Sequence, residues 1–307
     1  MSRITAVDWS GEKATACAWC DEPLTAGATR KIGRTECGFC GSATTDPLPD
    51  AASLDAAYGE WYWPKSGKRF GLIGDAMLRR SRAAMANRID EIAPPGPVLD
   101  VGAGEGTLID ALKARGREAS GLERLPTRED IVDLPLTEVE GRYAAIVFWH
   151  SLEHLPDSGA VLKAASERLV PGGVVIVAVP DLSSRQARLF GDRWLHLDLP
   201  RHLVHLTTAS LSAGMERNGL RVEGVSRTRG GQNLIGWLDG FVASLPGRLD
   251  LYQALRRKEA RRISMSPGRR AASILTGIAL APLALVCATA EALSGPSGTV
   301  YIEGRLV

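Results

Sequence analysis

From residue 98 onward, short continuous apolar runs alternate with segments in which apolar residues recur at helical spacing. The runs have the length and composition of buried strands: Val98–Val101, Glu118–Leu122, Ala144–Phe148 and Val174–Val179. Helical spacing follows at Thr107–Arg115 and Ser158–Leu169. Strands that alternate with helices in this way form parallel sheets covered by helices on both faces. The pattern therefore predicts an α/β fold with a doubly wound, Rossmann-like sheet.

The segments around this core complete the predicted organisation. A helix is expected over about Leu72–Ile92, and further strands near Arg221–Val225 and over Thr299–Gly304. The proline-containing segment Asp46–Asp50 is typical of a linker. We therefore expect three parts: a small module in residues 1–50, an aromatic arm and lead-in helix in 51–97, and the α/β domain in 98–307, with an apolar helical insertion at about 230–297 before the last strand.

The insertion contains a stretch without charge, Ala271–Ala290, that is long enough to cross a membrane. A crossing would separate the last strand from its sheet, so we expect a buried or surface-lying helix pair. Several basic residues precede the stretch: Arg256, Arg257, Lys258, Arg261, Arg262, Arg269 and Arg270. Because a basic flank beside an apolar helix suits an anionic membrane surface, we hypothesise peripheral membrane contact through residues 256–290.

The first strand ends in a turn that contains Gly102, Gly104 and Gly106, and a helix follows directly. Glycine lets the main chain of such a turn approach a ligand closely, because no side chain blocks the approach. Asp100 precedes the first glycine, and Glu123 ends the next strand. A carboxylate in the position of Glu123 can accept hydrogen bonds from both hydroxyls of a ribose. The pattern predicts a nucleoside-binding turn.

These residues resemble the first motif, D-x-G-x-G-x-G, of the class I S-adenosylmethionine (SAM)-dependent methyltransferases, and the resemblance covers roughly residues 55–307. It implies a seven-stranded methyltransferase sheet and SAM as the cofactor. It also implies a set of cofactor-binding residues: Asp100, Gly102, Ala103, Gly104, Gly106, Glu123, Asp133, Trp149 and His150. Within this set, the position of Asp133 contacts the adenine in the family, with Asp130 or Glu129 as alternatives for that contact, and Trp149 lines the cofactor pocket.

All the histidines fall in one part of the chain: His150, His154, His196, His202 and His205. The two segments that contain them resemble the W-H-x-L-E-H-x-x-D segment of small-molecule methyltransferases and the W-x-x-L-D-x-P-R-H-x-x-H-x-T signature of bacterial methyltransferases. We expect the second segment to cover the acceptor site. The candidate catalytic residues are His202, His205 and His150, because an imidazole titrates near neutral pH. Arg201 would either bind an anionic group of the acceptor or tether this lid.

The string His150-x-x-Glu153-His154 leaves two interpretations open. Ubiquinone-type O-methyltransferases carry a similar acidic string that holds a divalent ion. One carboxylate and two imidazoles would favour a borderline ion such as zinc. Alternatively, Glu153 and His154 are structural and bond to neighbouring backbone.

Four cysteines have the spacing C-x2-C-x16-C-x2-C: Cys17, Cys20, Cys37 and Cys40. This is the spacing of a four-thiolate zinc site, and so small a module needs metal to fold. A closed four-sulfur shell has no open position for substrate, so we expect a structural zinc in a zinc-ribbon-like module. Some rRNA methyltransferases carry an N-terminal zinc module, but residues 1–50 hold five basic and seven acidic residues, the wrong balance for RNA.

Charge and thiol content narrow the function classes. The net charge of +2 gives no global attraction for nucleic acid. Paired cysteines suited to metal, and a start without a secretory pattern, favour the cytoplasm, with membrane association on its cytoplasmic face as a further hypothesis. The aromatic stretch Tyr58–Pro64 either packs the module onto the domain or covers the cofactor.

The sequence thus predicts a SAM-dependent methyltransferase that modifies oxygen or carbon of a small-molecule or lipid-linked acceptor of the sugar, quinone or secondary-metabolite type. The alternatives are an RNA methyltransferase that uses the zinc module for recognition, and a non-catalytic SAM-binding scaffold.

Overall fold

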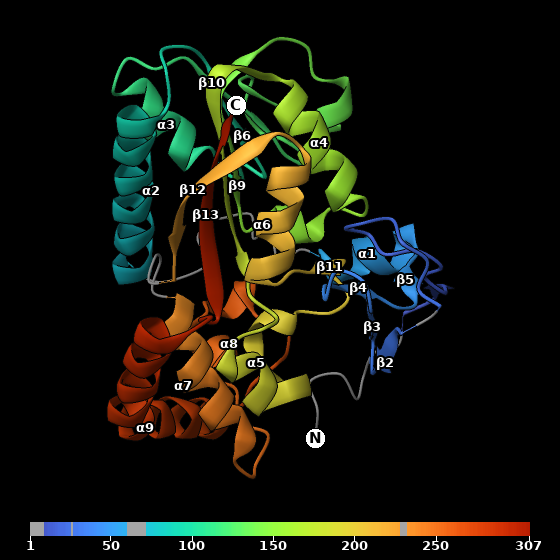
Figure 1. Cartoon of the computed structure of the whole chain (residues 1–307). Coiled ribbons are helices and arrows are strands. Elements are labelled where there is room, and N and C mark those ends of the chain that lie inside the picture. The colour runs from blue at the N-terminus through green and yellow to red at the C-terminus, as the bar shows by residue number, and fades with distance from the viewer. Residues whose placement is uncertain (1–8, 26, 60–71, 228–231) are drawn as a thin grey trace.

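The central sheet contains seven strands in the order β12-β13-β10-β9-β6-β7-β8 (Figure 1). The computed structural model describes residues 9–25, 27–59, 72–227 and 232–307. The strands of the sheet are β6 (Val98–Val101), β7 (Ala119–Leu122), β8 (Ile131–Val132), β9 (Tyr143–Trp149), β10 (Leu169–Pro180), β12 (Leu220–Ser226) and β13 (Thr299–Leu306). The five strands β6 to β10 pair in parallel, whereas β13 runs antiparallel between β10 and β12. The predicted seven-stranded, Rossmann-like sheet is confirmed.

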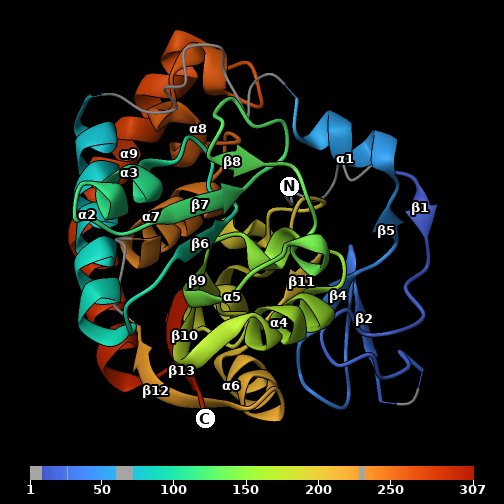
Figure 2. The ribbon, with the colours of Figure 1, turned by 90° about the horizontal axis from the view of Figure 1, so that it is seen from above.

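Helices cover both faces of the sheet, as the alternating pattern predicts. They are α2 (Leu72–Ile92), α3 (Thr107–Lys113), α4 (Ser158–Glu167) and α6 (Thr208–Arg217). Helices α2 and α3 lie on one face, and α4 and α6 on the other (Figure 2). Successive side chains of a strand point to opposite faces, so Val98 joins the core beneath α2 and α3, while Leu99 joins the core beneath α4 and α6.

A helical group lies beyond the carboxyl ends of the parallel strands (Figure 1): α5 (Arg185–Phe190), α7 (Gln232–Ser244), α8 (Leu251–Leu255) and α9 (Pro267–Ser294). Residues 271–290 lie within the continuous helix α9, so the prediction of a helix pair is wrong. Pro282 lies inside this helix, and packing along α7 and α8 holds the two halves together despite the lost hydrogen bond. The segment lies at the surface, one of the two predicted alternatives.

The N-terminal module is built of short elements: β1 (Gly11–Glu12), β2 (Thr29–Lys31), β3 (Arg34–Glu36), β4 (Ala43–Thr45), β5 (Leu48–Pro49) and α1 (Ala51–Ala57). Strand β4 also pairs with β11 (Val204–His205), which belongs to the α/β domain, so the second sheet has the order β11-β4-β3-β2. Short 3-10 helices complete the chain: η1 (Leu136–Glu138), η2 (Leu152–His154), η3 (Gly191–Arg193), η4 (Leu195–Leu197) and η5 (Lys258–Ala260). Of the aromatic stretch Tyr58–Pro64, only Tyr58 and Gly59 lie among the described residues.

Trp19 anchors the module to the α/β domain. Its side chain is 3% exposed, and its Nε1 donates a hydrogen bond to the carbonyl oxygen of Ser210 in α6 (2.8 Å). A Cβ on Gly214 would lie 2.2 Å from the Trp19 ring, and a Cβ on Gly159 would lie 2.2 Å from its carbonyl oxygen. The two parts of the chain therefore share one closely packed interface.

Replacement of Trp19 by alanine should lower the free energy of unfolding by about 3–5 kcal/mol, because the indole fills this interface. Urea unfolding followed by circular dichroism measures the change. Phe39→Ala is the matched control in the same module, since Phe39 is 72% exposed, and it should change the free energy by no more than about 0.5 kcal/mol. Equal stability of the two variants would contradict a shared interface.

Candidate functional site

The glycine turn follows β6 at the carboxyl edge of the sheet. Gly102, Gly104 and Gly106 have φ values of +81°, +58° and +75°, in the left-handed region that favours glycine. A Cβ on Gly102 would lie 2.4 Å from the Cβ of Ser151. The turn therefore needs glycine at position 102 both for its conformation and for the close approach of the segment after β9.

Glu123 lies directly beside this turn. Its Oε2 accepts a hydrogen bond from the backbone N–H of Gly104 (2.9 Å). Asp133, the predicted adenine contact, follows β8, and its Oδ2 accepts a hydrogen bond from the N–H of Leu125 (3.4 Å). Glu123 thus lies beside the turn at the end of β7, and Asp133 follows the neighbouring strand β8.

Arg82 is a site residue that the sequence analysis missed. Asp100 is buried, and burial raises its pKa to about 6 although the Arg82 guanidinium opposes the shift. The Arg82 guanidinium also lies 5.1 Å from the centre of the Trp149 ring. The missed signal is periodicity, since Arg82 lies three and seven residues before Met85 and Ile89, on the buried face of α2.

One cavity of about 3040 Å³ connects these groups. It is lined by predicted cofactor residues: Gly102, Ala103, Gly104, Glu123, Asp133, Trp149 and His150. Asp100 and Gly106 are not among its lining residues, because Asp100 is buried in β6 and Gly106 is buried at the N-cap of α3. The volume exceeds the roughly 300–1,000 Å³ of a typical small-ligand pocket. It can therefore hold a nucleoside cofactor together with a second molecule.

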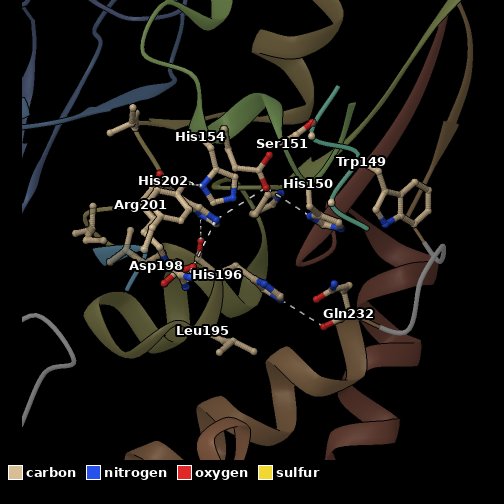
Figure 3. A pocket seen from close by; sticks show the side chains of 18 of the residues that line it. Trp149, His150, Ser151, His154, Leu195, His196, Asp198, Arg201, His202 and Gln232 are labelled. Atoms are coloured by element: carbon tan, nitrogen blue, oxygen red, sulfur yellow. Dashed lines mark hydrogen bonds and ion pairs between the residues drawn. The ribbon is translucent and has the colours of Figure 1, made fainter. Parts of the chain in front are cut away.

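Four of the five histidines line this cavity: His150, His154, His196 and His202 (Figure 3). Three of them, His150, His154 and His202, surround the carboxylate of Glu153. Its Oε1 lies 3.5 Å from His150 Nδ1 and 3.9 Å from His202 Nε2. Burial alone would raise the pKa of Glu153, but the neighbouring histidines lower it to about 2. Glu153 is thus a buried, ionised carboxylate shared by several imidazoles.

His150 combines exposure to the cavity with a constrained backbone. Its φ of +55° is uncommon for a residue with a side chain, and its N–H donates to the carbonyl oxygen of Ala178 (2.8 Å). Its side chain is 20% exposed, compared with 9% for that of His202. Of these two predicted bases, His150 presents the more accessible imidazole.

The candidate metal ligands differ from the predicted set. Ligand atoms of Glu153, His154 and His202 all lie within 4.8 Å of one another. His202 therefore joins Glu153 and His154 in the group that could hold an ion, in place of His150. His154 Nδ1 contacts the hydroxyl of Tyr58 (2.9 Å) and the carbonyl oxygen of Arg201 (3.0 Å).

His205 lies beside His202, with the ring centres 6.4 Å apart, but its imidazole faces the N-terminal module. Its Nε2 is 3.1 Å from the Thr45 hydroxyl of the N-terminal module, and burial lowers its pKa well below the usual value. It does not line the described cavity. Arg201, in the same lid, forms an ion pair with Asp198 and lies 5.9 Å from the centre of the Tyr58 ring. Arg201 also lines the cavity, so the tethering role and the anion-binding role both stay predictions.

The four predicted zinc ligands come together in the N-terminal module. The Sγ atoms of Cys17 and Cys40 are 3.8 Å apart, and those of Cys20 and Cys37 are 3.7 Å apart. A tetrahedron with zinc–sulfur bonds of about 2.3 Å has edges of about 3.8 Å. All four cysteines are free of disulfides. The sulfur positions therefore match a tetrahedral four-thiolate site.

The sequence is similar to those of known methyltransferases. Residues 76–225 match the protein family described as "Methyltransferase domain". The chain is 27% identical over 156 residues to "Ubiquinone biosynthesis O-methyltransferase" of Xylella fastidiosa (strain M23), which covers 43% of this chain and 63% of that protein. It is 26% identical over 153 residues to the protein of the same name from Bordetella avium, with 40% and 64% covered. The chain thus spans less than two thirds of the length of these curated relatives.

A SAM-dependent methyltransferase from Archaeoglobus fulgidus is 14% identical, with a TM-score of 0.45, over 74% of this chain and 94% of that one. The matched family, the named relatives and the observed seven-stranded sheet together support a SAM-dependent methyltransferase domain in this chain.

The buried histidines predict a loss of stability in acid. Burial, reinforced by nearby histidines, lowers the pKa of His154 to about 4 and that of His196 to about 3. In the unfolded chain both histidines have the ordinary pKa of about 6.5. Between about pH 6.5 and 4 the unfolded state therefore binds protons that the folded state does not, so stability should fall as the pH falls.

Urea midpoints at about pH 7 and pH 5 measure this dependence. His196→Gln removes one of the buried imidazoles and should make the decrease less steep than in the unmodified protein. An unchanged steepness in this variant would rule out His196 as one of the responsible groups.

Proposed function

We propose that this protein transfers the methyl group of SAM to an oxygen or carbon atom of a small-molecule or lipid-linked acceptor. One observation carries the proposal: Glu123, bonded to the N–H of Gly104, lines the same cavity as the pair formed by His150 and Glu153. A nucleoside-binding turn and a candidate base thus face one space.

The residues around the glycine turn fit SAM. The bare main chain of Gly102 to Gly104 would lie against the adenosyl group, with Glu123 on the ribose hydroxyls and Asp133 toward the adenine. Arg82 and Trp149 would line the same pocket. When bound, SAM supplies a methyl group already activated for attack, so the protein mainly has to orient the acceptor.

His150 is the proposed general base. Its imidazole removes the proton from an acceptor hydroxyl or carbon acid, and the ionised carboxylate of Glu153, 3.5 Å from Nδ1, stabilises the imidazolium that forms. His202, which lies in the lid, contacts the same carboxylate and positions it. His205, bonded to Thr45 outside the cavity, serves the lid rather than the chemistry.

The acceptor compartment combines apolar and basic side chains. Leu245, Leu249, Leu255 and Ile263 line the end of the cavity near α8, together with Arg248, Arg262 and Arg269. Such a lining favours an acceptor with an apolar body and an anionic group. It supports a lipid-linked, sugar, quinone or secondary-metabolite acceptor.

The zinc module has a structural role in this proposal. A zinc ion held by Cys17, Cys20, Cys37 and Cys40 would fix the strand that pairs with the lid. Four reduced thiolates require a reducing compartment, which favours the cytoplasm.

SAM binding tests the cofactor site. Gly104→Leu should lower the affinity for S-adenosylhomocysteine at least about 100-fold in isothermal titration, because its side chain would fill the space beside the turn. Gly116→Asn, at an exposed glycine with a φ of +79° and open space around it, should bind normally.

Methyl transfer tests the proposed base. His150→Gln should bind S-adenosylhomocysteine normally but should no longer transfer labelled methyl groups from SAM to acceptor molecules in a cell extract. Normal transfer by this variant would exclude His150 as the base.

Metal analysis tests the zinc site. The purified protein should contain one zinc per chain, and Cys37→Ser/Cys40→Ser should lose it. Loss of the ion should also lower the thermal midpoint by several degrees, because a structural zinc contributes folding energy. A second metal equivalent that disappears in Glu153→Gln but not in the cysteine variant would instead identify an ion at Glu153, His154 and His202.

A further inference from the structure

Helix α9 exposes its large apolar side chains to solvent, whereas an ordinary surface helix buries them. Its large apolar side chains point outward, with exposed fractions of 49% to 83%: Leu275, Ile278, Leu283, Leu285, Val286 and Leu293. Charged residues are missing from this outward face between Ala271 and Ala290. Among the described residues, α9 is the helix long and apolar enough to cross a membrane, and 22% of its most apolar stretch is buried. So large an apolar surface indicates a contact site.

The inward face of α9 carries small or polar residues. They are Ser273, Gly277, Ala284, Ala288 and Glu291. A Cβ on Gly277 would lie 2.9 Å from the side chain of Leu251 in α8. The buried carboxylate of Glu291 accepts hydrogen bonds from Trp237 Nε1 (2.8 Å) and from Gln186 Nε2 (3.0 Å). These contacts hold α9 against the helical group by its small side.

The packed face extends along most of the helix. Ser273 and Glu291 are separated by about 27 Å of helix axis, and both are buried. A helix that spans a bilayer would have to leave this packing, and β13 directly after α9 lies inside the sheet. The geometry therefore favours a helix that lies parallel to a surface and presents only its outer face.

Charge selects an anionic surface as the occupant. Residues 256–270 contain seven basic side chains and one acidic one, and apart from Arg256 the basic residues are at least partly exposed. A second copy of this chain offers no matching acidic patch along α9, because Glu291, the one acidic residue of the helix, is 0% exposed. An anionic membrane complements both the apolar face and the basic flank.

The large cavity reaches this same flank. Arg262 and Ile263 line it, and so does Arg269 in the first turn of α9. The cavity thus extends from the glycine turn to the basic end of the apolar helix. This continuity connects the surface to the site where the acceptor is modified.

We propose that the outward face of α9 rests in the interfacial layer of an anionic lipid bilayer, parallel to its plane, and that a lipid-borne acceptor enters the cavity beside Arg262 and Arg269. The second part rests on the proposed methyltransferase function. The membrane contact itself is argued only from the exposed apolar face of α9 and from the basic residues that precede it.

Flotation with vesicles tests the contact. The full-length protein should float with phosphatidylglycerol-containing vesicles, remain at the bottom with pure phosphatidylcholine, and be released by alkaline carbonate. Ile278→Glu/Val286→Glu should reduce partitioning at least about 100-fold, because two side chains leave the apolar layer. The matched control Leu189→Glu/Val225→Glu changes two exposed apolar residues outside α9 and should float normally. Lys258→Ala/Arg262→Ala should weaken partitioning roughly fivefold per residue.

Three outcomes would overturn the contact: no flotation with anionic vesicles, normal flotation of Ile278→Glu/Val286→Glu, or resistance to carbonate. If the protein does not float but sediments as a dimer, and Ile278→Glu/Val286→Glu makes it monomeric, then a second copy of the chain covers α9. That result would also overturn the membrane contact. Titration of the same samples with S-adenosylhomocysteine separates the two proposals. Binding without flotation would refute only the membrane contact, and flotation without binding would refute only the methyltransferase function.

Discussion

The hydrogen bonds that join three strand ends at the carboxyl edge of the sheet are the constraint on which the site depends. The N–H groups of Gly102 and Ala103 donate to the carbonyl oxygen of Leu122, and the Ser151 hydroxyl donates to that of Val101. These bonds fix the ends of β6, β7 and β9 relative to one another. Because Gly102 has no side chain, the segment that carries His150 and Glu153 can lie directly against the turn. The candidate base and the nucleoside pocket are thereby placed by backbone geometry rather than by long side chains.

The four-cysteine module acts on the same site through the lid. The Thr45 N–H donates to the carbonyl oxygen of Leu203, and the Thr45 hydroxyl to that of His202 (2.6 Å). The Leu203 N–H in turn donates to the carbonyl oxygen of Glu153 (2.7 Å). A continuous set of hydrogen bonds thus leads from β4 of the module to the cluster around Glu153. A zinc ion bound by the four cysteines would therefore act on the proposed site without contacting substrate, by holding the strand to which the lid is paired.

The sequence predicted those features that depend on neighbouring residues. The strands around Asp100 and Glu123 were evident because apolar runs and glycine turns are local patterns. The roles of Arg82 and His205 were not, since each depends on which distant element packs against it: β6 and Trp149 for Arg82, and the Thr45 hydroxyl for His205. The candidate metal-binding group of Glu153, His154 and His202 was missed for the same reason, because the fold brings His202 to the other two. Continuity of α9 through Pro282 also required knowledge of the helices beneath it.

The proposed function places its two tasks on different parts of the structure. The proposed cofactor site lies on the sheet edge, where the N–H of Gly104 is hydrogen-bonded to Glu123. The proposed acceptor site is lined by the helical group that the insertion adds beyond that edge. Within this group, buried polar contacts such as Gln186 with Glu291 join α5 to α9, and a buried polar group of this kind is tolerated only when its hydrogen bonds are satisfied. Directional bonds and the close packing of small residues such as Gly277, Ala284 and Ala288 therefore hold α9 in place. That arrangement leaves its large apolar residues available for a contact outside the molecule.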